Sequence, residues 1–284
     1  MDERRSDLKK IIMDTKTLPT LPGVINKLNS LSNDDKSSVQ EMARIVSADQ
    51  VLSARILRLA NSPSYGFYRV STISNAMILL GVNVVKSLAL SSSIFEIMEK
   101  NSVGLWEHSL GTATAAGIIA RKLALSEVEE ITTAGLLHDI GKVIIGLKCA
   151  EQMPEIRRQI KLDDLYISDA EKAVLDTDHA EVGGWLSKSW FLPDKLSEPI
   201  AHHHNVAGSE DHRVKTSVVH LADVLIKASG FGDSGDSYVP PIQQLAWDQL
   251  KLDEALLQEI VVELEDKLVE VKNFSLELAS AAVA

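Results

Sequence analysis

The rest of this sequence is interpreted from one stretch, Ala134-Gly135-Leu136-Leu137-His138-Asp139-Ile140-Gly141-Lys142. Apolar residues surround a histidine and an aspartate, which places an imidazole and a carboxylate next to a hydrophobic core. A lone carboxylate in an apolar core is strongly disfavoured unless another polar group or a metal ion pairs with it. We therefore expect His138 and Asp139 to meet further polar side chains in the folded chain.

Further histidines and a second aspartate occur on other predicted helices, on faces that should point inward. His179 shares a helical face with Val182, and Asp223 shares one with Ile226. A single histidine on an apolar face is commonly a hydrogen-bonded core residue, whereas several on separate helices indicate a shared site. The candidate residues are His108, His138, Asp139, His179, the triplet His202-His203-His204, and Asp223.

These side chains form a donor set that suits a transition metal. Neutral imidazole and carboxylate ligands favour Fe, Mn, Zn or Ni, whereas an all-oxygen site favours Mg or Ca. The adjacent pair His138-Asp139 can present both side chains to one ion, and Asp139 can reach a second ion through its other oxygen. The pattern therefore predicts a metal centre.

The sequence carries the start and stop signals of successive helices. Ser38, Ser126 and Ser168 each precede a glutamate by three residues, the capping-box pattern of helix starts. Apolar residues recur at helical spacing over residues 45–59, and Asn61-Ser62-Pro63 then ends that pattern. No sustained period-two run is bounded by hairpin turns, so we predict an all-α fold.

Two features near the C-terminus leave alternatives open. One is a glycine-rich break between helices, Gly230-Phe231-Gly232-Asp233-Ser234-Gly235, which is followed by Pro240-Pro241. We interpret it as a mobile surface loop, with a lid or a partner-contact segment as the alternative. An apolar stripe from Leu256 to Val271 can pack on the core or on a second chain, so the sequence leaves the oligomeric state open.

Bulk composition excludes several functions. The chain has 284 residues, of which 45% are hydrophobic and 24% charged, as in ordinary globular proteins. A formal net charge of -11 leaves no cationic excess to displace phosphate counterions, and an aromatic content of 5% offers few stacking platforms. We therefore expect no nucleic-acid partner. The apolar runs are short and interrupted by charge, so we also expect no membrane-spanning segment.

The cysteine content and the N-terminal residues favour a cytoplasmic location. Cys149 is the only cysteine, so the chain has no internal disulfide and fits a reducing compartment. Met1 precedes Asp2-Glu3-Arg4-Arg5, and no apolar stretch of signal-peptide length follows. We therefore predict a cytoplasmic protein.

The polar residues of the predicted metal centre resemble a known signature. His108, His138-Asp139 and Asp223 match the H…HD…D signature of the HD superfamily of metal-dependent phosphohydrolases. This signature is specific as a combination, whereas a His-Asp dipeptide alone carries no information. The resemblance implies a helical fold and a metal-binding site formed by these residues.

A longer part of the motif looks like the HD-GYP cyclic-di-GMP phosphodiesterases. The run His138-Asp139-Ile140-Gly141-Lys142 is followed by His179 and by the pair His203-His204, with His202-His203 as the alternative register. The resemblance implies that Lys142 contacts a substrate phosphate. It also implies two metal ions, or three, held by His108, His138, Asp139, His179, His203, His204 and Asp223.

The sequence departs from the HD-GYP family directly after the histidine pair. That family carries a glutamate and then a Gly-Tyr-Pro element at this point. Here the residues are Asn205-Val206-Ala207-Gly208-Ser209-Glu210, without Gly-Tyr-Pro. The departure argues against specificity for cyclic-di-GMP.

The first hundred residues resemble a different branch of the superfamily. Four segments look like the HDOD (HD-related output domain) pattern. They are Leu18-Pro19-Thr20-Leu21-Pro22-Gly23-Val24, Ile45-Val46-Ser47-Ala48-Asp49, Ile56-Leu57-Arg58-Leu59-Ala60-Asn61-Ser62 and Leu80-Gly81-Val82. The resemblance runs from about residue 11 to residue 230, and its Leu-Ala-Asn-Ser element is the most specific part. HDOD proteins are mainly bacterial signalling modules, and many have lost the metal ligands that this sequence retains.

This resemblance implies an architecture as well as a family. We expect an N-terminal helical subdomain packed on an HD-type helical bundle. The predicted divisions are an N-terminal extension (1–10), the N-terminal helical part of the HDOD domain (11–100), an HD-like metal-binding part (101–230), and a loop with C-terminal helices (231–284).

The function implied is that of a signal-transduction regulator with a retained di-metal site. Its cofactors would be two divalent transition-metal ions, with Fe or Mn preferred to Zn or Ni, and its partner a signalling protein or a nucleotide-like phosphorylated ligand. The main alternative is a metal-dependent phosphohydrolase acting on a phosphodiester or nucleotide-like substrate, with Asp139 and Lys142 as catalytic residues. A third is an oxygen-using di-iron enzyme of the mixed-valent HD type.

Overall fold

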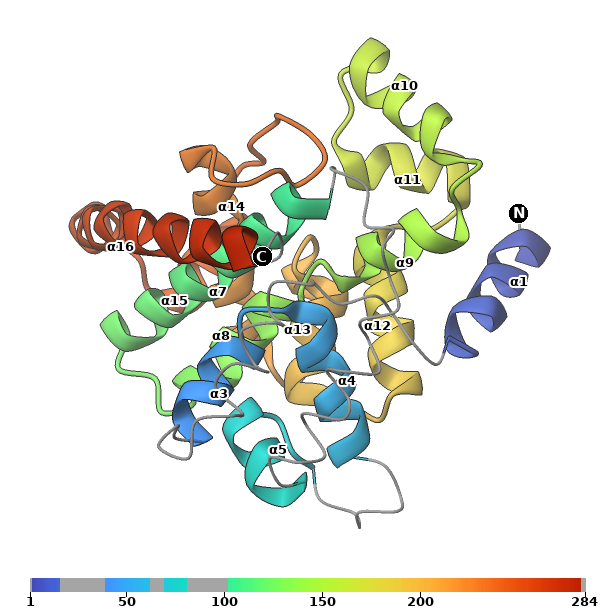
Figure 1. Ribbon diagram of the computed structural model, residues 1–284. Coiled ribbons are helices and arrows are strands. Elements are labelled where there is room, and N and C mark those ends of the chain that lie inside the picture. Colours follow the sequence, from blue (N-terminus) through green and yellow to red (C-terminus); the bar gives the residue numbers. More distant parts are fainter. Residues whose placement is uncertain (1, 16–38, 62–68, 81–101, 282–284) are drawn as a thin grey trace.

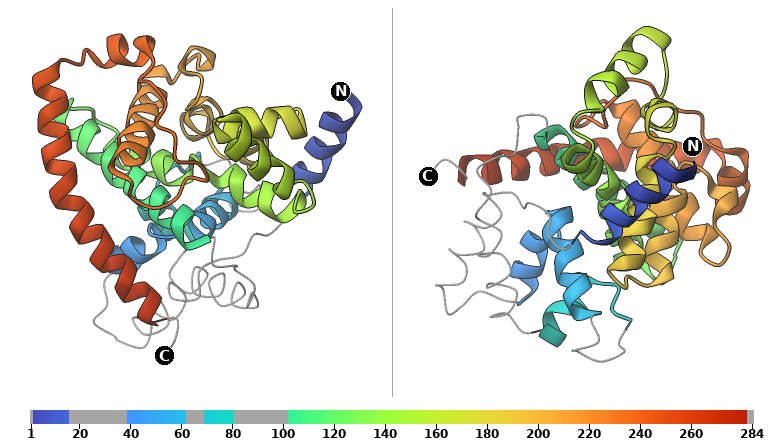
Figure 2. Two further views of the ribbon diagram at one scale, coloured as in Figure 1. Left: turned by 90° about the horizontal axis from the view of Figure 1, so that it is seen from above. Right: turned by 90° about the vertical axis from the view of Figure 1, so that its right-hand side faces the viewer.

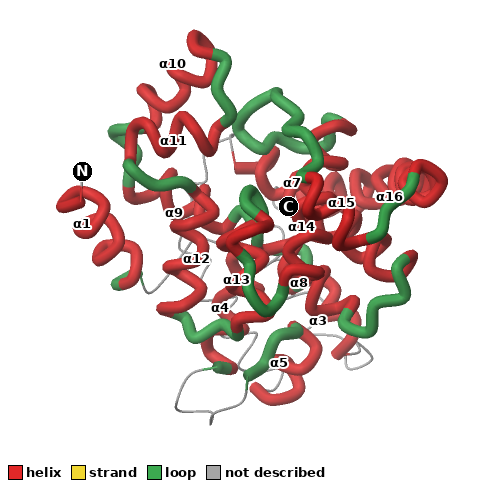
Figure 3. The backbone as a smooth tube through the Cα atoms, turned by 180° about the vertical axis from the view of Figure 1, so that it is seen from behind, coloured by secondary structure: helices red, strands yellow, loops and turns green. Residues whose placement is uncertain are grey.

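Helices account for all regular structure in the described part of the chain (Figures 1 and 3). The computed structural model describes residues 2–15, 39–61, 69–80 and 102–281. No strand occurs within these ranges, so the prediction of an all-α fold is confirmed.

Four described helices form the N-terminal part, and one of them shows how the local sequence sets its ends. The N-cap residue Asp49 accepts a hydrogen bond from the backbone N of Leu52 (2.8 Å), and Asn61 ends the same helix. The side chain of Asn61 also bonds the backbone of Val70 in both directions, which holds the next segment beside the helix end. These helices are α1 (Asp2–Met13), α3 (Val39–Val46), α4 (Gln50–Ala60) and α5 (Ile73–Leu80).

Six helices form the bundle that carries the polar motif. Helix α7 packs along α8 and α14, and α12 packs against both α9 and α13. Their bounds are α7 (Ser102–Lys122), α8 (Val128–Leu137), α9 (Ile140–Lys148), α12 (His179–Ser189), α13 (Asp194–His202) and α14 (Arg213–Ser229).

The remaining elements surround this bundle. Helices α10 and α11 pack on each other beside α12, whereas α15 and α16 lie against α14 and α7. Figures 1 and 2 show α16 along one side of the molecule and α1 on the opposite side. The bounds are α10 (Met153–Asp163), α11 (Ile167–Leu175), the 3-10 helix η2 (Val206–Gly208), α15 (Gln244–Leu250) and α16 (Glu254–Ala281).

Two clusters of buried apolar side chains hold the fold together. The larger one joins the N-terminal helices to the bundle, because Leu57 and Ile73 belong to the same cluster as Leu137 and Ile144. This arrangement is the expected packing of an N-terminal helical part on an HD-type bundle. The exact divisions at residues 10, 100 and 230 stay a prediction.

The second cluster decides between the two alternatives for the C-terminal stripe. Ile260, Leu264 and Leu268 of α16 are buried together with Ile118 and Ile119 of α7. The stripe therefore packs on the core of the same chain.

Several helix starts differ from the sequence prediction. Helix α8 begins at Val128 with Glu127 at its N-cap, and α11 begins at Ile167, so neither Ser126 nor Ser168 caps a helix. The stripe over residues 45–59 is divided between α3 and α4, because Asp49 starts a new helix. The Ser38 start, the residues 18–24 of the HDOD pattern, and its Ser62 and Gly81-Val82 lie outside the described residues.

A polar junction fastens the N-terminal part to three helices of the bundle. The carboxylate of Glu130 on α8 accepts a hydrogen bond from Ser71 Oγ (2.9 Å) and pairs with Lys195 Nζ of α13 and with Lys215 Nζ of α14 (3.0 Å). Partial burial raises the pKa of Glu130, but the two ammonium groups outweigh it and lower the pKa to about 2.

This junction should make stability depend on pH in the acid range. The folded-state pKa of Glu130 lies below its ordinary value of 4.5, so its contribution is complete above pH 4.5 and is lost as the pH falls towards 2. We expect Glu130→Gln to remove about 1–2 kcal/mol at pH 7, because the group is partly solvated, and nothing near pH 2. Urea denaturation from pH 2 to pH 7 measures this. The exposed neighbour Glu129→Gln is the control, and equal pH profiles for both variants would contradict the prediction.

Among the described residues, no helix has both the length and the apolar composition needed to cross a bilayer.

Candidate metal centre

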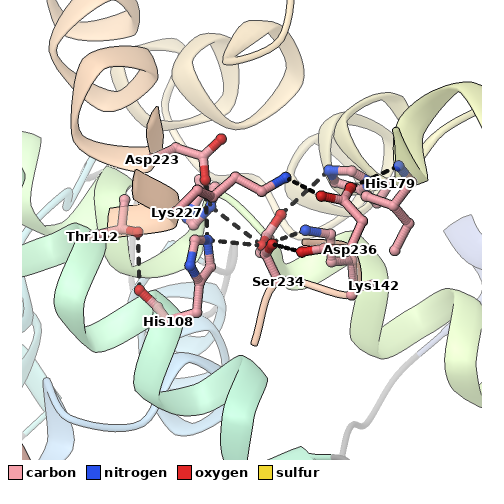
Figure 4. Close-up of polar contacts among 12 residues, drawn as sticks. His108, Thr112, Lys142, His179, Asp223, Lys227, Ser234 and Asp236 are labelled. Carbon is pink, nitrogen blue, oxygen red and sulfur yellow. Dashed lines mark hydrogen bonds and ion pairs between the residues drawn. The ribbon is translucent and has the colours of Figure 1, made fainter. Parts of the chain in front are cut away.

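All seven residues singled out by the sequence meet in one buried cluster between the bundle helices. His108 comes from α7 and Asp223 from α14, and their side chains point toward each other (Figure 4). His138 and Asp139 occupy the junction between α8 and α9, His179 is the first residue of α12, and His203-His204 follow α13 directly. Six of the seven are at most 2% exposed, and His204 is half-buried.

Asp139 lies at the centre of the cluster and separates the histidines into two groups. Its Oδ2 lies 3.5 Å from His108 Nε2 and 3.3 Å from His138 Nε2. Its Oδ1 lies 3.3 Å from His179 Nε2 and 3.8 Å from His203 Nε2. The two oxygens of one carboxylate therefore face different sets of imidazole nitrogens, as a carboxylate shared by two ions requires.

Each group contains donors close enough to share an ion. His108, His138 and Asp223 have ligand atoms within 4.8 Å of one another, and so have His179, His203 and His204. The shortest contacts within these groups are His108 Nε2 to Asp223 Oδ1, at 3.0 Å, and His179 Nε2 to His204 Nε2, at 2.8 Å. Both groups could hold a metal ion.

Helix ends orient two of the imidazoles. His138 and His203 are the C-cap residues of α8 and α13, where the last carbonyls of a helix lack an intrahelical partner. The Nδ1 of His138 donates to the Gly135 carbonyl (2.7 Å), and the Nδ1 of His203 donates to the Ile200 carbonyl (2.9 Å). With Nδ1 fixed as the donor, Nε2 is left as a lone-pair ligand that faces the cluster.

Four buried atoms of the cluster show that its donor set fits a metal. The Nε2 atoms of His108, His138 and His203 and the Oδ1 of Asp139 have no hydrogen-bond partner among the described residues. His108 Nε2 and Asp223 Oδ1 are close, but they are not aligned as a hydrogen bond. Unpartnered buried polar atoms are costly, and cations held by the two groups would satisfy all four.

The electrostatics of the cluster also favour a cation. Burial lowers the pKa of His138, but Asp139 and Asp223 outweigh it and raise the pKa to about 9. Burial raises the pKa of Asp139, but His138 and Lys142 outweigh it, so the pKa stays well below its usual range. Burial lowers the pKa of His203 to about 4. The carboxylates are thus ionised and His203 is neutral, which are the forms that bind metals, whereas His138 carries a second proton in the metal-free protein that a metal ion would displace.

A model of the HDOD domain family matches residues 18–206, well over half of the chain. The chain belongs to the HDOD domain family. The matched region is shorter than the resemblance over residues 11–230. It contains six of the seven cluster residues and ends before Asp223.

Known proteins similar to this HDOD chain include one curated relative. An uncharacterized protein of Treponema pallidum (strain Nichols) is 25% identical over 226 residues. The alignment covers 74% of this chain but 42% of that protein, so the chain spans less than half the length of this curated relative.

Three solved structures show the same fold. An HDOD domain protein of unknown function from Geobacter sulfurreducens has a TM-score of 0.61 at 27% identity and covers 98% of both chains. A virulence factor from Campylobacter jejuni subsp. jejuni has a TM-score of 0.66 at 22% identity, covering 87% of this chain and 99% of that one. The MmoQ response regulator from Methylococcus capsulatus str. Bath has a TM-score of 0.65 at 22% identity, covering 86% and 98%.

Lys142, the last residue of the run His138-Asp139-Ile140-Gly141-Lys142, lies at the edge of the cluster. Its Nζ donates to Asp139 Oδ2 (2.7 Å), and its side chain is 8% exposed. Burial lowers the pKa of Lys142, but Asp139 and Asp223 outweigh it and raise the pKa above its ordinary value. The ammonium is therefore charged and adjoins the same carboxylate oxygen as His108 and His138.

His202 lies apart from the seven-residue cluster of candidate ligands. This favours the register His203-His204 over His202-His203. The space beside its Nδ1 is filled by the backbone of Gly208, where an added Cβ would lie 2.6 Å away. No candidate ligand group among the described residues contains His202.

Three further residues support the metal centre: sequence reasoning missed Glu171 and Gln243, and it placed His220, one helical turn before Asp223, as either a supporting or a packed residue. Glu171 on α11 accepts hydrogen bonds from the backbone N (2.8 Å) and from Nδ1 (2.6 Å) of His179. His220, considered only as a supporting or packed residue, donates from Nδ1 to the His203 carbonyl (2.8 Å), and Gln243 bonds the His204 carbonyl (2.8 Å). Glu171 was noticed only as part of a capping box, because it lies on α11 while His179 begins α12, and the contact between the two helices cannot be read from spacing.

Glu171 should therefore affect metal affinity without being a ligand. Glu171→Ala removes the acceptor that fixes the tautomer and orientation of His179, so we expect metal affinity to fall about 10- to 100-fold. The measurement is competition with a chromogenic chelator. Glu171→Gln, which keeps an acceptor oxygen, should restore part of the affinity. Asp169→Asn, an exposed change on the same helix, is the control, and an unchanged affinity of Glu171→Ala would contradict this role.

Proposed function

We propose that this HDOD protein is a signalling regulator whose buried centre binds two divalent transition-metal ions bridged by Asp139. The observation that carries the proposal is the position of Asp139, whose Oδ2 faces His108 and His138 while its Oδ1 faces His179 and His203. Asp223 would complete the first position, and His204 the second. Imidazole donors suit Fe, Zn or Ni and carboxylates suit Mn, so the mixed donor set fits all four ions, of which we propose Fe or Mn.

The charge of such a centre indicates the class of its ligand. Two divalent ions carry a charge of +4, which Asp139 and Asp223 offset only in part. The remaining positive charge, together with the Lys142 ammonium, favours an anionic ligand such as a nucleotide-like phosphate. We expect this ligand, or a signalling protein that responds to it, to be the physiological partner.

Burial supports a binding role over turnover. Six of the seven donor side chains are at most 2% exposed, and His204 alone is partly open among these donors. Lys142, the residue expected to hold a substrate phosphate, is instead paired with Asp139 at 2.7 Å. A regulator can respond to slow ligand entry, whereas a hydrolase has to admit substrate and release product in every cycle.

Phosphohydrolysis is the second candidate, and the shared carboxylate is the observation that favours it. When bound, two divalent ions would supply Lewis acidity at phosphoryl oxygens and lower the pKa of water. In that case Asp139 would hold both ion positions, and Lys142 would turn from Asp139 Oδ2 to a nonbridging phosphate oxygen.

Elemental analysis of protein purified without chelator tests the metal proposal. We expect about two Fe, Mn or Zn per chain. Absence of metal after purification and after anaerobic reconstitution with each ion would overturn the proposal.

A substrate panel separates the regulator from the hydrolase. Metal-loaded protein is incubated with a chromogenic phosphodiester, cyclic dinucleotides and guanosine polyphosphates, and phosphate or nucleotide release is measured. The regulator predicts no turnover above the level of an Asp139→Asn variant. Multiple turnovers that disappear in Asp139→Asn would establish the hydrolase instead.

A further inference from the structure

The glycine-rich segment predicted as a mobile surface loop crosses the cluster between α14 and α15. We call residues 230–243 the strap. It leaves the end of α14 at Gly230, whose φ of +66° reverses the chain, and it reaches α15 at Gln244. Along this path it contacts α7, α11 and the backbone beside α13, which are three separate supports of the candidate metal centre.

The first contact lies on the backbone of His108. Gly232 adopts a φ of +76°, and an added Cβ would lie 2.3 Å from the backbone N of His108. The next residue, Asp233, donates its backbone N–H to the Gly104 carbonyl (2.9 Å). Only glycine fits between the strap and α7 here, because both the backbone conformation and the space exclude a side chain.

The last contact lies on the backbone of His204, at the other end of the cluster. The side chain of Gln243 donates to the His204 carbonyl (2.8 Å) and accepts from the backbone N of Val206 (3.0 Å). The backbone N of Gln243 donates to Nε2 of His220 (3.0 Å). The strap thus contacts the backbone of one donor from each of the two metal-binding groups.

A buried ion pair fixes the middle of the strap. Lys227 Nζ lies 3.1 Å from Asp236 Oδ1, and the two side chains are 5% and 0% exposed. Lys227 follows Asp223 by one helical turn on α14, and its side chain extends toward Asp236 beside the cluster (Figure 4). Asp236 Oδ2 also accepts from the backbone N of Ile167 (2.8 Å), the first residue of α11.

This contact reaches the second metal-binding group as well. Helix α11 carries Glu171 one turn after Ile167, and Glu171 holds His179. Gly235 packs against Ile167, where an added Cβ would meet the Ile167 side chain at 2.5 Å. The position of Asp236 is therefore connected to His108 through the strap and to His179 through α11.

We propose that the strap is a cover over the metal centre and that the Lys227–Asp236 ion pair is its latch. In the closed state the pair holds residues 230–243 across the donors, and release of the pair opens a path for metal and anionic ligand. The consequence for metal exchange rests on the proposed function, whereas the latch itself does not.

The chemistry of the strap explains why one ion pair can control it. Phe231 and Ile242 pack on the second apolar cluster at the two ends of the strap, whereas its middle carries Gly232 and Gly235, and Val239 is 46% exposed, so apolar burial holds the ends of the strap more than its middle. A buried ion pair that loses one partner leaves an uncompensated charge, which is strongly unfavourable. Loss of the latch should therefore release the strap without unfolding the bundle.

Hydrogen exchange on metal-free protein tests the latch. Asp236→Asn removes the charge and keeps the shape, and we expect the amides of Ile167 and Tyr238, which donate to Asp236, to exchange at least about tenfold faster. Amides in the middle of α14 should keep their rates. Asp233→Asn, an exposed carboxylate of the same strap, is the matched control and should leave the Ile167 amide unchanged.

A second variant separates the latch from a general loss of structure. Lys227→Met breaks the same pair with an apolar side chain of similar length, and it should give the same acceleration as Asp236→Asn. The exchange rates of the double variant should not exceed those of either single variant, because all three proteins lack the same single interaction. Unchanged exchange in both single variants, additive effects in the double variant, or equal acceleration throughout α14 would each overturn the latch.

Chelator-driven metal loss then tests whether the strap covers the centre. Each protein is loaded with the metal found by elemental analysis, and excess EDTA is added. Asp236→Asn and Lys227→Met should lose that metal at least about tenfold faster than wild type and Asp233→Asn. Equal rates in all four proteins would overturn the covering role. If no protein binds metal, the proposed function fails, while the exchange result on metal-free protein still decides the latch.

Discussion

Asp139→Asn is expected to lose both metal ions together, from about two per chain to almost none. Among the described residues, Asp139 is the carboxylate whose two oxygens face both histidine groups, so its loss removes an anionic ligand from each position. The affinity for each ion should fall by more than about 100-fold, beyond the 10- to 100-fold typical for loss of a supporting partner. Elemental analysis after dialysis against a defined free-metal concentration measures the effect.

Asp223→Asn is the matched control, because Asp223 belongs to one group only. This variant should retain the ion held by His179, His203 and His204 and lose the other, giving about one metal per chain. Equal metal contents of the two variants would contradict the bridging geometry.

Removal of Asp139 should also affect the fold, independently of metal. It leaves the Lys142 ammonium buried without its partner, and breaking a buried ion pair in this way costs about 3–5 kcal/mol. Adding Lys142→Met should recover most of the lost stability but none of the lost metal. Thermal denaturation of the metal-free variants separates the two effects.

Gly141→Ala is expected to give the largest packing defect of any glycine-to-alanine change in the described part of the chain. A Cβ at position 141 would lie 1.9 Å from the His179 carbonyl oxygen and 2.9 Å from the backbone N of Gly183. Both neighbours are backbone atoms, so α9 and α12 would have to separate. We expect a loss of more than about 3 kcal/mol, at the upper end of overpacking effects, and a decrease in Tm on the order of 10 °C.

The same substitution should move His179 away from Asp139 and weaken metal binding in whatever protein remains folded. Gly146→Ala provides the control on the same helix, since nothing lies within 4 Å of a Cβ there. That variant should be neutral or more stable by about 0.5–1 kcal/mol, because alanine is the better helix former. Similar melting temperatures for the two variants would show that α9 and α12 are not in the close contact described above.

Much of the fold followed from local patterns in the sequence. Helical spacing and the absence of period-two runs predicted an all-α chain, and the motifs predicted its family. Helix ends were predicted less well, as Ser126 and Ser168 show, because a capping motif competes with nearby alternatives. The start of α11 depends instead on Asp236, which is 69 residues away.

The choice of site residues also followed largely from sequence, because each side chain is of a ligand type and lies on a predicted inward face. Histidine and aspartate at positions such as His179 and Asp223 identified the site without knowledge of how the helices meet. Glu171 and Asp236 carry the same kind of carboxylate, but their partners His179 and Lys227 lie outside the helix α11 and the strap that carry them. Spacing within one helix cannot predict such contacts.

The sequence by itself determined the donor chemistry, and the tertiary structure decided how the donors are divided and covered. The motif His138-Asp139 supplied an imidazole and a carboxylate, but only helix packing placed the two oxygens of Asp139 against different histidines. Likewise, the glycines of the strap predicted a flexible loop, whereas the folded chain holds that loop through Lys227 and Asp236. Side-chain type is a property of each residue alone, but burial and pairing depend on distant segments that meet only after folding.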